Sequence, residues 1–252
     1  MQRMSLTHTR KTQRGVALFV VIVFVMLSML LALWASRTSL FNEMVVGNDA
    51  DYQRTFEAAQ ALLLDAELDI RGENADGSSC TGGGDVCRTS TTAKIPLETQ
   101  DVGPLLSMLT DQAAATARTD AMRATLCDHG LCAKRADKQD FWSDSATLGN
   151  MTAAGVGARY GQYTGATAGS SSKPANPILS ATGSSNGGWY WIEVLPYSDS
   201  SKTSSLIVGA PSNLLPLNLT PSVVYRITAL AYGRRNTVVV LQQTYAQQKL
   251  KD

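Results

Sequence analysis

One run of residues has the pattern of a catalytic motif. Residues 183–187 read GSSNG and so fit G-x-S-x-G, in which Ser185 would be the nucleophile of a hydrolase. That chemistry requires a strand before the serine, a helix after it and a histidine as the base. Here a Ser- and Gly-rich stretch precedes the motif, a strand-like run follows it, and the histidines of the chain are His8 and His129. The sequence therefore argues against a hydrolase, and we expect no enzymatic activity.

Other patterns that bind ligands are incomplete. Gly155 and Gly157 lack a third glycine at the dinucleotide-binding spacing, and the sequence has no phosphate-binding loop. Two groups of aspartates could offer oxygen ligands to calcium, but neither follows the EF-hand spacing. These groups are Asp76 with Asp85, and Asp137 with Asp140 and Asp144. Solvated surface acids are the simpler interpretation, so we predict no metal and no cofactor.

The first element that could position a site is an apolar helix. Residues 16–36 carry no charge, and 21 residues at about 1.5 Å each make roughly 31 Å of helix, enough to cross a bilayer. The stretch is longer than the apolar region of a secretory signal, and residues 32–35 (ALWA) are a poor cleavage site. The leader before it, residues 1–15, has four cations and no acid: Arg3, Arg10, Lys11 and Arg14. We predict a single span with the leader in the cytoplasm and the rest outside.

An amphipathic pattern continues this helix over residues 37–70. Apolar residues recur there at alternating spacings of four and three, as on one helical face: Tyr52, Phe56, Ala59, Leu63, Ala66 and Ile70. We predict that this stripe packs against a globular domain. Four charged residues are expected on the opposite, exposed face: Arg54, Glu57, Asp65 and Asp69.

The remaining residues, 71–252, are predicted to form a globular head. Glycines end the first helix, and a second helix is expected at about residues 105–126. Residues 165–188 have the composition of an exposed loop. β-branched and aromatic runs then predict strands at 189–195, 206–209, 223–232 and 237–245, with a hairpin turn at 232–236. The pattern indicates an α+β fold in which a long helix packs on an antiparallel sheet.

Four cysteines lie in the predicted head. Cys80 and Cys87 are seven residues apart, and Cys127 and Cys132 are five apart. Outside the cytoplasm such cysteines favour two disulfides, and each close pair could join locally, although three connectivities remain open. Zinc is the alternative, but the spacings exceed the usual two to four and ligand histidines are missing. We expect disulfides.

The amino-terminal segment resembles the class III signal of type IV pilins. That signal is a short basic leader ending in Arg-Gly, followed by a hydrophobic helix, as in RGVALFVVIVFVML from Arg14 onward. Further segments resemble PilX-type minor pilins, near both ends of the chain: Gly47-Asn48, Asp51, residues 56–61 (FEAAQA), 65–67 (DAE), 225–229 (YRITA) and 236–242 (NTVVVLQ). The resemblance implies a pilin-like fold, cleavage after Gly15 by a prepilin peptidase and methylation of the new terminus, Val16.

The resemblance also draws attention to Val20, which stands where pilins usually carry a Glu, five residues after the cut. In a pilus shaft that Glu is thought to face the amino terminus of a neighbouring subunit. An unpaired charge in such a core is strongly unfavourable. A subunit without the Glu therefore suits a position where it has no neighbouring amino terminus to pair with. By resemblance this position is the filament tip, which is assigned to PilX-type pilins and to the K-type pseudopilins of type II secretion.

The function implied is that of a minor pilin in type IV pilus assembly. It would cross the bacterial inner membrane once, then pass to the pilus tip on the cell surface, prime pilus growth and support adhesion or twitching. The implied partners are the prepilin peptidase, other minor pilins, the major pilin and a PilY-type tip adhesin. Two alternatives remain: a K-type pseudopilin, and a single-pass membrane-anchored extracytoplasmic binding protein.

Charge gives no indication of a nucleic-acid partner. The chain has 22 basic and 21 acidic residues. Without the four leader cations, 18 basic residues face 21 acidic ones, which is a net charge of −3. A nucleic-acid-binding domain is usually basic, so we predict none.

Overall fold

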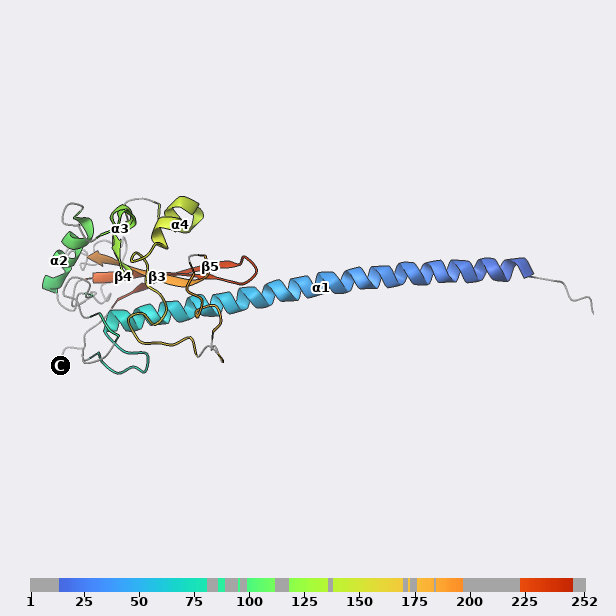
Figure 1. Ribbon diagram of the computed structural model, residues 1–252, viewed down its shortest axis with the longest axis horizontal. Helices are drawn as coiled ribbons and strands as arrows, with labels where there is room; N and C mark the ends of the chain where they lie inside the picture. Colours follow the sequence, from blue (N-terminus) through green and yellow to red (C-terminus); the bar gives the residue numbers. More distant parts are fainter. Residues whose placement is uncertain are drawn as a thin grey trace, which may run out of the picture. The chain divides into compact units, whose positions relative to one another are not determined.

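The computed structural model describes most of the chain. The described residues are 14–80, 86–88, 95, 99–111, 118–135, 138–169, 172, 176–183, 185–196 and 223–246. They belong to two compact units, Met1–Ala50 and Asp51–Asp252. Figure 1 shows the helices and strands and labels the longer ones as they are named below.

Helix α1 spans Arg14–Arg71. It has no proline and is rich in Ala, Leu and Met, which favour helix. Within the first unit the side chains from Val16 to Val46 are all exposed. By length and composition, α1 can cross a membrane. The helix ends where Gly72 adopts a φ of +67° and the amide of Glu73 donates to the carbonyl of Leu68 (3.0 Å), a common helix stop.

The second unit contains a five-stranded sheet in the order β1-β2-β3-β4-β5. The strands are β1 (Cys127–Asp128), β2 (Leu131–Ala133), β3 (Gly187–Pro196), β4 (Val223–Tyr232) and β5 (Val238–Tyr245). All neighbours are antiparallel except β2 and β3, which run parallel. The predicted α+β class, with a long helix and a mostly antiparallel sheet, is confirmed. The strand predicted at 206–209 lies outside the described residues.

Along the chain, several short helices follow α1 and precede the long strands β3, β4 and β5. They are α2 (Thr99–Thr110), α3 (Asp120–Thr125), the 3-10 turn η1 (Phe141–Ser143) and α4 (Ser145–Met151). The single helix predicted at 105–126 is wrong. Thr119 is extended, with a ψ of 163°, and its hydroxyl accepts a hydrogen bond from the amide of Met122 (3.3 Å). This N-cap begins a separate helix; residues 112–117 lie outside the described part.

Both faces of β3 are buried. Alternate residues of a strand point to opposite faces, and Tyr190 and Ile192 belong to the main hydrophobic core, which also contains Leu62 of α1. Trp189 and Trp191 belong to a second core with residues of α3, η1 and α4. Burial on two sides explains why this strand reads as an almost uninterrupted apolar run, WYWIEVL.

Candidate functional site

The part of α1 that belongs to the second unit, residues 51–71, has a buried face that differs from the predicted one. Of the predicted stripe, Ala59, Ala66 and Ile70 are buried, Phe56 and Leu63 are half-buried, and Tyr52 is exposed. The stripe therefore lies toward one side of the buried face. The middle of that face is formed by Asp51, Thr55, Ala58, Leu62, Asp65 and Asp69.

The predicted exposure of Asp65 and Asp69 is wrong, whereas Arg54 and Glu57 are exposed as expected. Only 2% of Asp65 and 5% of Asp69 is accessible to solvent. Aspartate is rarely buried unless its charge is compensated. Together with Asp51 these residues form what we call the carboxylate row: three buried acids on one face of α1, each bound to a different segment of the second unit.

Asp51 holds the turn between β4 and β5. Its carboxylate accepts hydrogen bonds from the amides of Arg234 (3.0 Å) and Arg235 (3.1 Å) and from the hydroxyl of Thr237 (2.6 Å). A Cβ on Gly233 would lie 2.5 Å from the Asp51 Oδ2, so the turn needs glycine to approach the helix. Burial alone would raise the pKa of Asp51, but these hydrogen bonds outweigh it and hold the pKa below its ordinary value.

Replacing Asp51 by Ala should therefore loosen the β4–β5 turn. We expect a loss of about 1 to 3 kcal/mol of unfolding free energy at pH 7, because three donors lose their acceptor. The loss should shrink as the pH falls below 3.8, the ordinary value at which an unfolded Asp takes up its proton. Denaturant unfolding followed by tryptophan fluorescence measures this.

Glu57→Ala is the matched control, because Glu57 is an exposed acid of the same helix. Its effect should stay within about 0.5 kcal/mol. Equal effects of the two substitutions would contradict the role given to Asp51.

Asp65 holds the loop of residues 160–165. It accepts a hydrogen bond from the amide of Gly161 (2.7 Å) and another from the hydroxyl of Thr164. Burial raises the pKa of Asp65 to about 6, although these two hydrogen bonds act in the opposite direction, and the negative charge of Asp69 raises it further. Asp65 is thus a carboxylate whose ionised form is poorly stabilised in the folded protein.

Asp69 forms a buried ion pair with Arg88. The Arg88 Nε lies 2.8 Å from Oδ1 and the Nη2 lies 2.7 Å from Oδ2, with the two side chains 3% and 2% exposed. The hydroxyl of Tyr190 also donates to Asp69 (2.9 Å). Burial alone would lower the pKa of Arg88, but the charge of Asp69 raises it above its ordinary value. Arg88 therefore carries its positive charge directly against the carboxyl group of Asp69.

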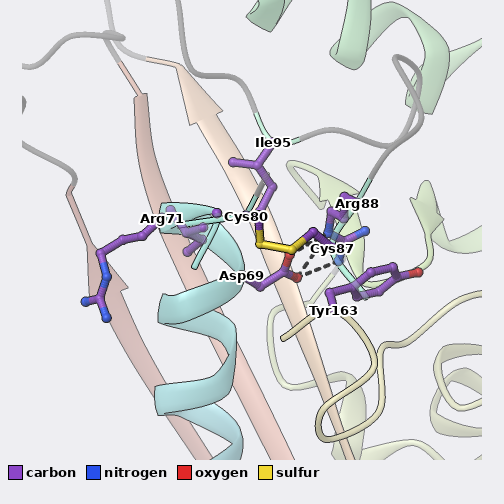
Figure 2. A pocket seen from close by; sticks show the side chains of 9 residues that line it. Asp69, Arg71, Cys80, Cys87, Arg88, Ile95 and Tyr163 are labelled. Carbon is purple, nitrogen blue, oxygen red and sulfur yellow. Dashed lines mark hydrogen bonds and ion pairs between the residues drawn. A yellow bond between two sulfur atoms is a disulfide. The ribbon is translucent and has the colours of Figure 1, made fainter. Parts of the chain in front are cut away.

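Arg88 also contacts two further segments. Its Nη2 donates to the carbonyl of His129 (2.9 Å), in the turn between β1 and β2, and its guanidinium lies 3.6 Å from the ring centre of Tyr163. Figure 2 shows Arg88 between Asp69 and Tyr163, beside a cavity of about 160 Å³. One guanidinium thus joins α1, the β1–β2 turn and the 160–165 loop.

The four cysteines form the disulfides Cys80–Cys87 and Cys127–Cys132. The sequence leaves three connectivities open, and the structure has the one in which each cysteine pairs with its near neighbour in the chain. Cys80 and Cys87 line the same cavity as Asp69 and Arg88 (Figure 2). Cys127 and Cys132 face each other in β1 and β2.

The remaining predicted positions lie apart from this cluster. Gly15, Val16 and Val20 are in the first turns of α1, and residues 1–13 lie outside the described part. Ser185 lies in a turn directly before β3, which is not a strand-to-helix turn. Among the described residues no group of three or more His, Cys, Asp or Glu side chains is placed to hold a metal ion. Asp85 and Asp137, two of the calcium candidates, are outside the described residues.

Sequence reasoning missed Arg88, Tyr163 and Tyr190 as partners of the helix. Their contacts with Asp69 and with one another join residues far apart in the chain, so no local pattern contains them. One signal was available: Asp65 and Asp69 stand one helical turn apart and directly beside the apolar residues Ala66 and Ile70.

Comparison with known families gives two matches. Residues 14–63 match a family model described as PilX N-terminal, and residues 128–247 match one described as type IV pilus assembly protein PilX C-term. The first match covers most of α1, and the second extends from β1 to just beyond β5. Searches of curated proteins and of solved structures give no match. Asp65, Asp69, Arg88 and the Cys80–Cys87 disulfide lie between the two matched regions.

Proposed function

Because this chain belongs to the PilX family of type IV pilus assembly proteins and is a minor pilin, we propose that it acts at the pilus tip. There it would help form the complex of minor pilins that primes pilus growth. Its part in the pilus is structural, and we propose assembly, without catalysis, as its role. Adhesion or twitching would then be outcomes of the pilus that it helps to build.

The observation that carries this proposal is the apolar first half of α1. Its side chains from Val16 to Val46 are exposed in the isolated chain, and so large an apolar surface is unfavourable in water. The helix serves as a single-pass membrane anchor. We infer that the membrane is the bacterial inner membrane and that helices of other pilins replace the lipid after assembly.

Val20 supports a position at the tip. Residues 16–36 contain no carboxylate that could pair with the terminal ammonium of a neighbouring subunit. A charge left unpaired in an apolar filament core would be costly. A subunit without this carboxylate fits best at the end of the filament, where no further subunit brings a terminal ammonium that needs a counter-charge.

The proposal includes a processing step and specific partners. A prepilin peptidase would cleave after Gly15, and Val16 would become the methylated amino terminus. Members of the PilX family interact with other pilus components. For this chain we propose the other minor pilins, the major pilin and a PilY-type tip adhesin as partners.

Mass spectrometry of the mature amino terminus tests the processing step. We expect a methylated Val16, and we expect Gly15→Val to retain the leader because the branched side chain blocks the cut. Ser28→Ala, inside the same apolar stretch, is the matched control and should be processed normally. An intact leader on the wild-type protein would contradict the proposal and favour a membrane-anchored binding protein.

Surface piliation tests the assembly role. Deleting the gene should reduce the number of pili without stopping processing of the major pilin. The wild-type gene should restore piliation, whereas Gly15→Val should not. Normal piliation combined with a defect in protein secretion would point to a K-type pseudopilin.

A further inference from the structure

The two disulfides differ in their surroundings. Cys127 and Cys132 are 0% exposed and belong to the second core, among Trp189, Trp191 and Met151. Cys80 and Cys87 are half-buried and line the cavity of about 160 Å³ beside the carboxyl-terminal end of α1. A thiol reagent has to reach a sulfur atom to exchange with it. The structure therefore gives it access to Cys80–Cys87 and denies it access to Cys127–Cys132.

The accessible disulfide is directly next to the residue that compensates a buried charge. Arg88 follows Cys87, and its guanidinium makes the ion pair with Asp69. Figure 2 shows the sulfur–sulfur bond beside this pair. Because Arg88 is bonded directly to Cys87, opening the disulfide removes a covalent constraint on the backbone that places the guanidinium beside Asp69.

The charge balance makes the position of Arg88 important. Asp65 and Asp69 are buried one turn apart on α1, and the described contacts of Asp65 are with neutral donors. If Arg88 leaves, the described side-chain contact that remains to Asp69 is the hydrogen bond from Tyr190. A carboxylate that loses its buried partner is strongly destabilising. Release of Arg88 should therefore loosen residues 65–71 of α1 from the sheet.

We propose that Cys80–Cys87 is a redox-active site, and that its oxidation state controls the docking of Arg88 on the carboxyl-terminal part of α1. The reagent is a dithiol in one direction and a disulfide-bearing oxidant in the other. In oxidation, one cysteine thiolate attacks a sulfur of the oxidant and forms a mixed disulfide. The second thiolate then displaces the oxidant's sulfur, so that two electrons pass to the oxidant, which leaves as a dithiol with the two protons.

The difference in access between the two disulfides can be tested by the order in which they are reduced. The full-length protein is held in detergent micelles for this experiment. The protein is exposed to dithiothreitol, free thiols are alkylated at intervals, and peptides are analysed by mass spectrometry. We expect Cys80–Cys87 to open at least tenfold faster than Cys127–Cys132. Equal rates, or earlier opening of Cys127–Cys132, would overturn the proposal.

Thermal unfolding tests the link to Arg88. Selective reduction of Cys80–Cys87 should lower the melting temperature by roughly 5 to 15 °C, and reoxidation should restore it. Arg88→Met should lower it too, and reduction should then lower it by clearly less than in the wild type, because only the loss of the chain constraint remains. Fully additive effects would show that the disulfide and Arg88 act independently and would refute the coupling.

A second variant and a spectroscopic measurement test the same link between the disulfide and Arg88. If Arg88→Met does not fold, Arg88→Lys retains the charge without the two-pronged contact and should show a smaller but still non-additive loss. Selective reduction should change the near-ultraviolet circular dichroism of the wild type more than that of Arg88→Met, because Tyr163 and Tyr190 adjoin Arg88 and the signal of the disulfide itself is lost in both proteins. Equal changes in the two proteins would mean that Arg88 stays docked after reduction, contrary to the proposal. None of these outcomes depends on the role of the protein in the pilus.

Discussion

Replacing Asp69 by Asn should destabilise the second unit by about 3 to 5 kcal/mol, because it leaves the guanidinium of Arg88 buried without its counter-charge. The amide keeps the shape of the side chain and one acceptor oxygen. The loss therefore reports the charge and not a cavity. Denaturant unfolding at pH 7 measures it.

Glu73→Gln is the control for this prediction. Glu73 pairs with Arg71 at 2.8 Å, but the two side chains are 29% and 34% exposed. Such a pair contributes at most about 1 kcal/mol. The double variant Asp69→Leu with Arg88→Met should recover much of the stability, since an apolar pair can replace a buried ion pair. A loss below 1 kcal/mol for Asp69→Asn would show that water reaches the pair.

Replacing Asp65 by Asn should have the opposite sign and stabilise the protein by about 2 to 3 kcal/mol at pH 7. Burial raises the pKa of Asp65 from 3.8 to about 6, so at pH 7 the folded protein holds an ionised carboxylate that is less favourable there than in the unfolded chain. Asn keeps an oxygen for the amide of Gly161 and can donate to the hydroxyl of Thr164. The substitution therefore removes the charge and keeps two hydrogen bonds, with the direction of the one to Thr164 reversed.

The pH dependence gives this prediction a second readout. Between pH 4 and pH 6 the folded protein retains a proton on Asp65 that the unfolded chain has lost, so the contribution of this residue falls as the pH rises. Unfolding free energies of wild type and Asp65→Asn should therefore be similar near pH 4 and separate by pH 7. A constant difference across this range would mean that Asp65 does not titrate there.

The elements with strong periodicity could be predicted from the sequence. The α1 helix and the strands β3, β4 and β5 have apolar patterns long enough to define them. The observed boundaries of β4 are those expected, and those of the other three elements lie within two residues of the expected ones. β1 and β2 have two and three residues, too few for a pattern. Their pairing depends on distant contacts, as in the hydrogen bond from the amide of Ile192 to the carbonyl of Gly130 (2.7 Å).

The carboxylate row could not be predicted from the sequence, because a buried acid and a solvated acid look alike until the partner is known. Arg88 is 19 residues from Asp69, and Thr164 is 99 residues from Asp65. Local rules place charged residues on the solvent side of an amphipathic helix. That rule holds for Arg54 and Glu57 and fails where the rest of the fold supplies donors. Cleavage after Gly15 and the role of Val20 stay predictions.

The spacing of the carboxylate row has a mechanical consequence. Asp51 and Asp69 are 18 residues apart, which is five turns and about 27 Å along α1. A pull along the axis of this segment would shear the contacts at Asp51, Asp65 and Asp69 together, whereas a pull at right angles would peel them off one after another. Bonds loaded in parallel share the force. For a subunit of a filament under tension, this arrangement resists axial load best.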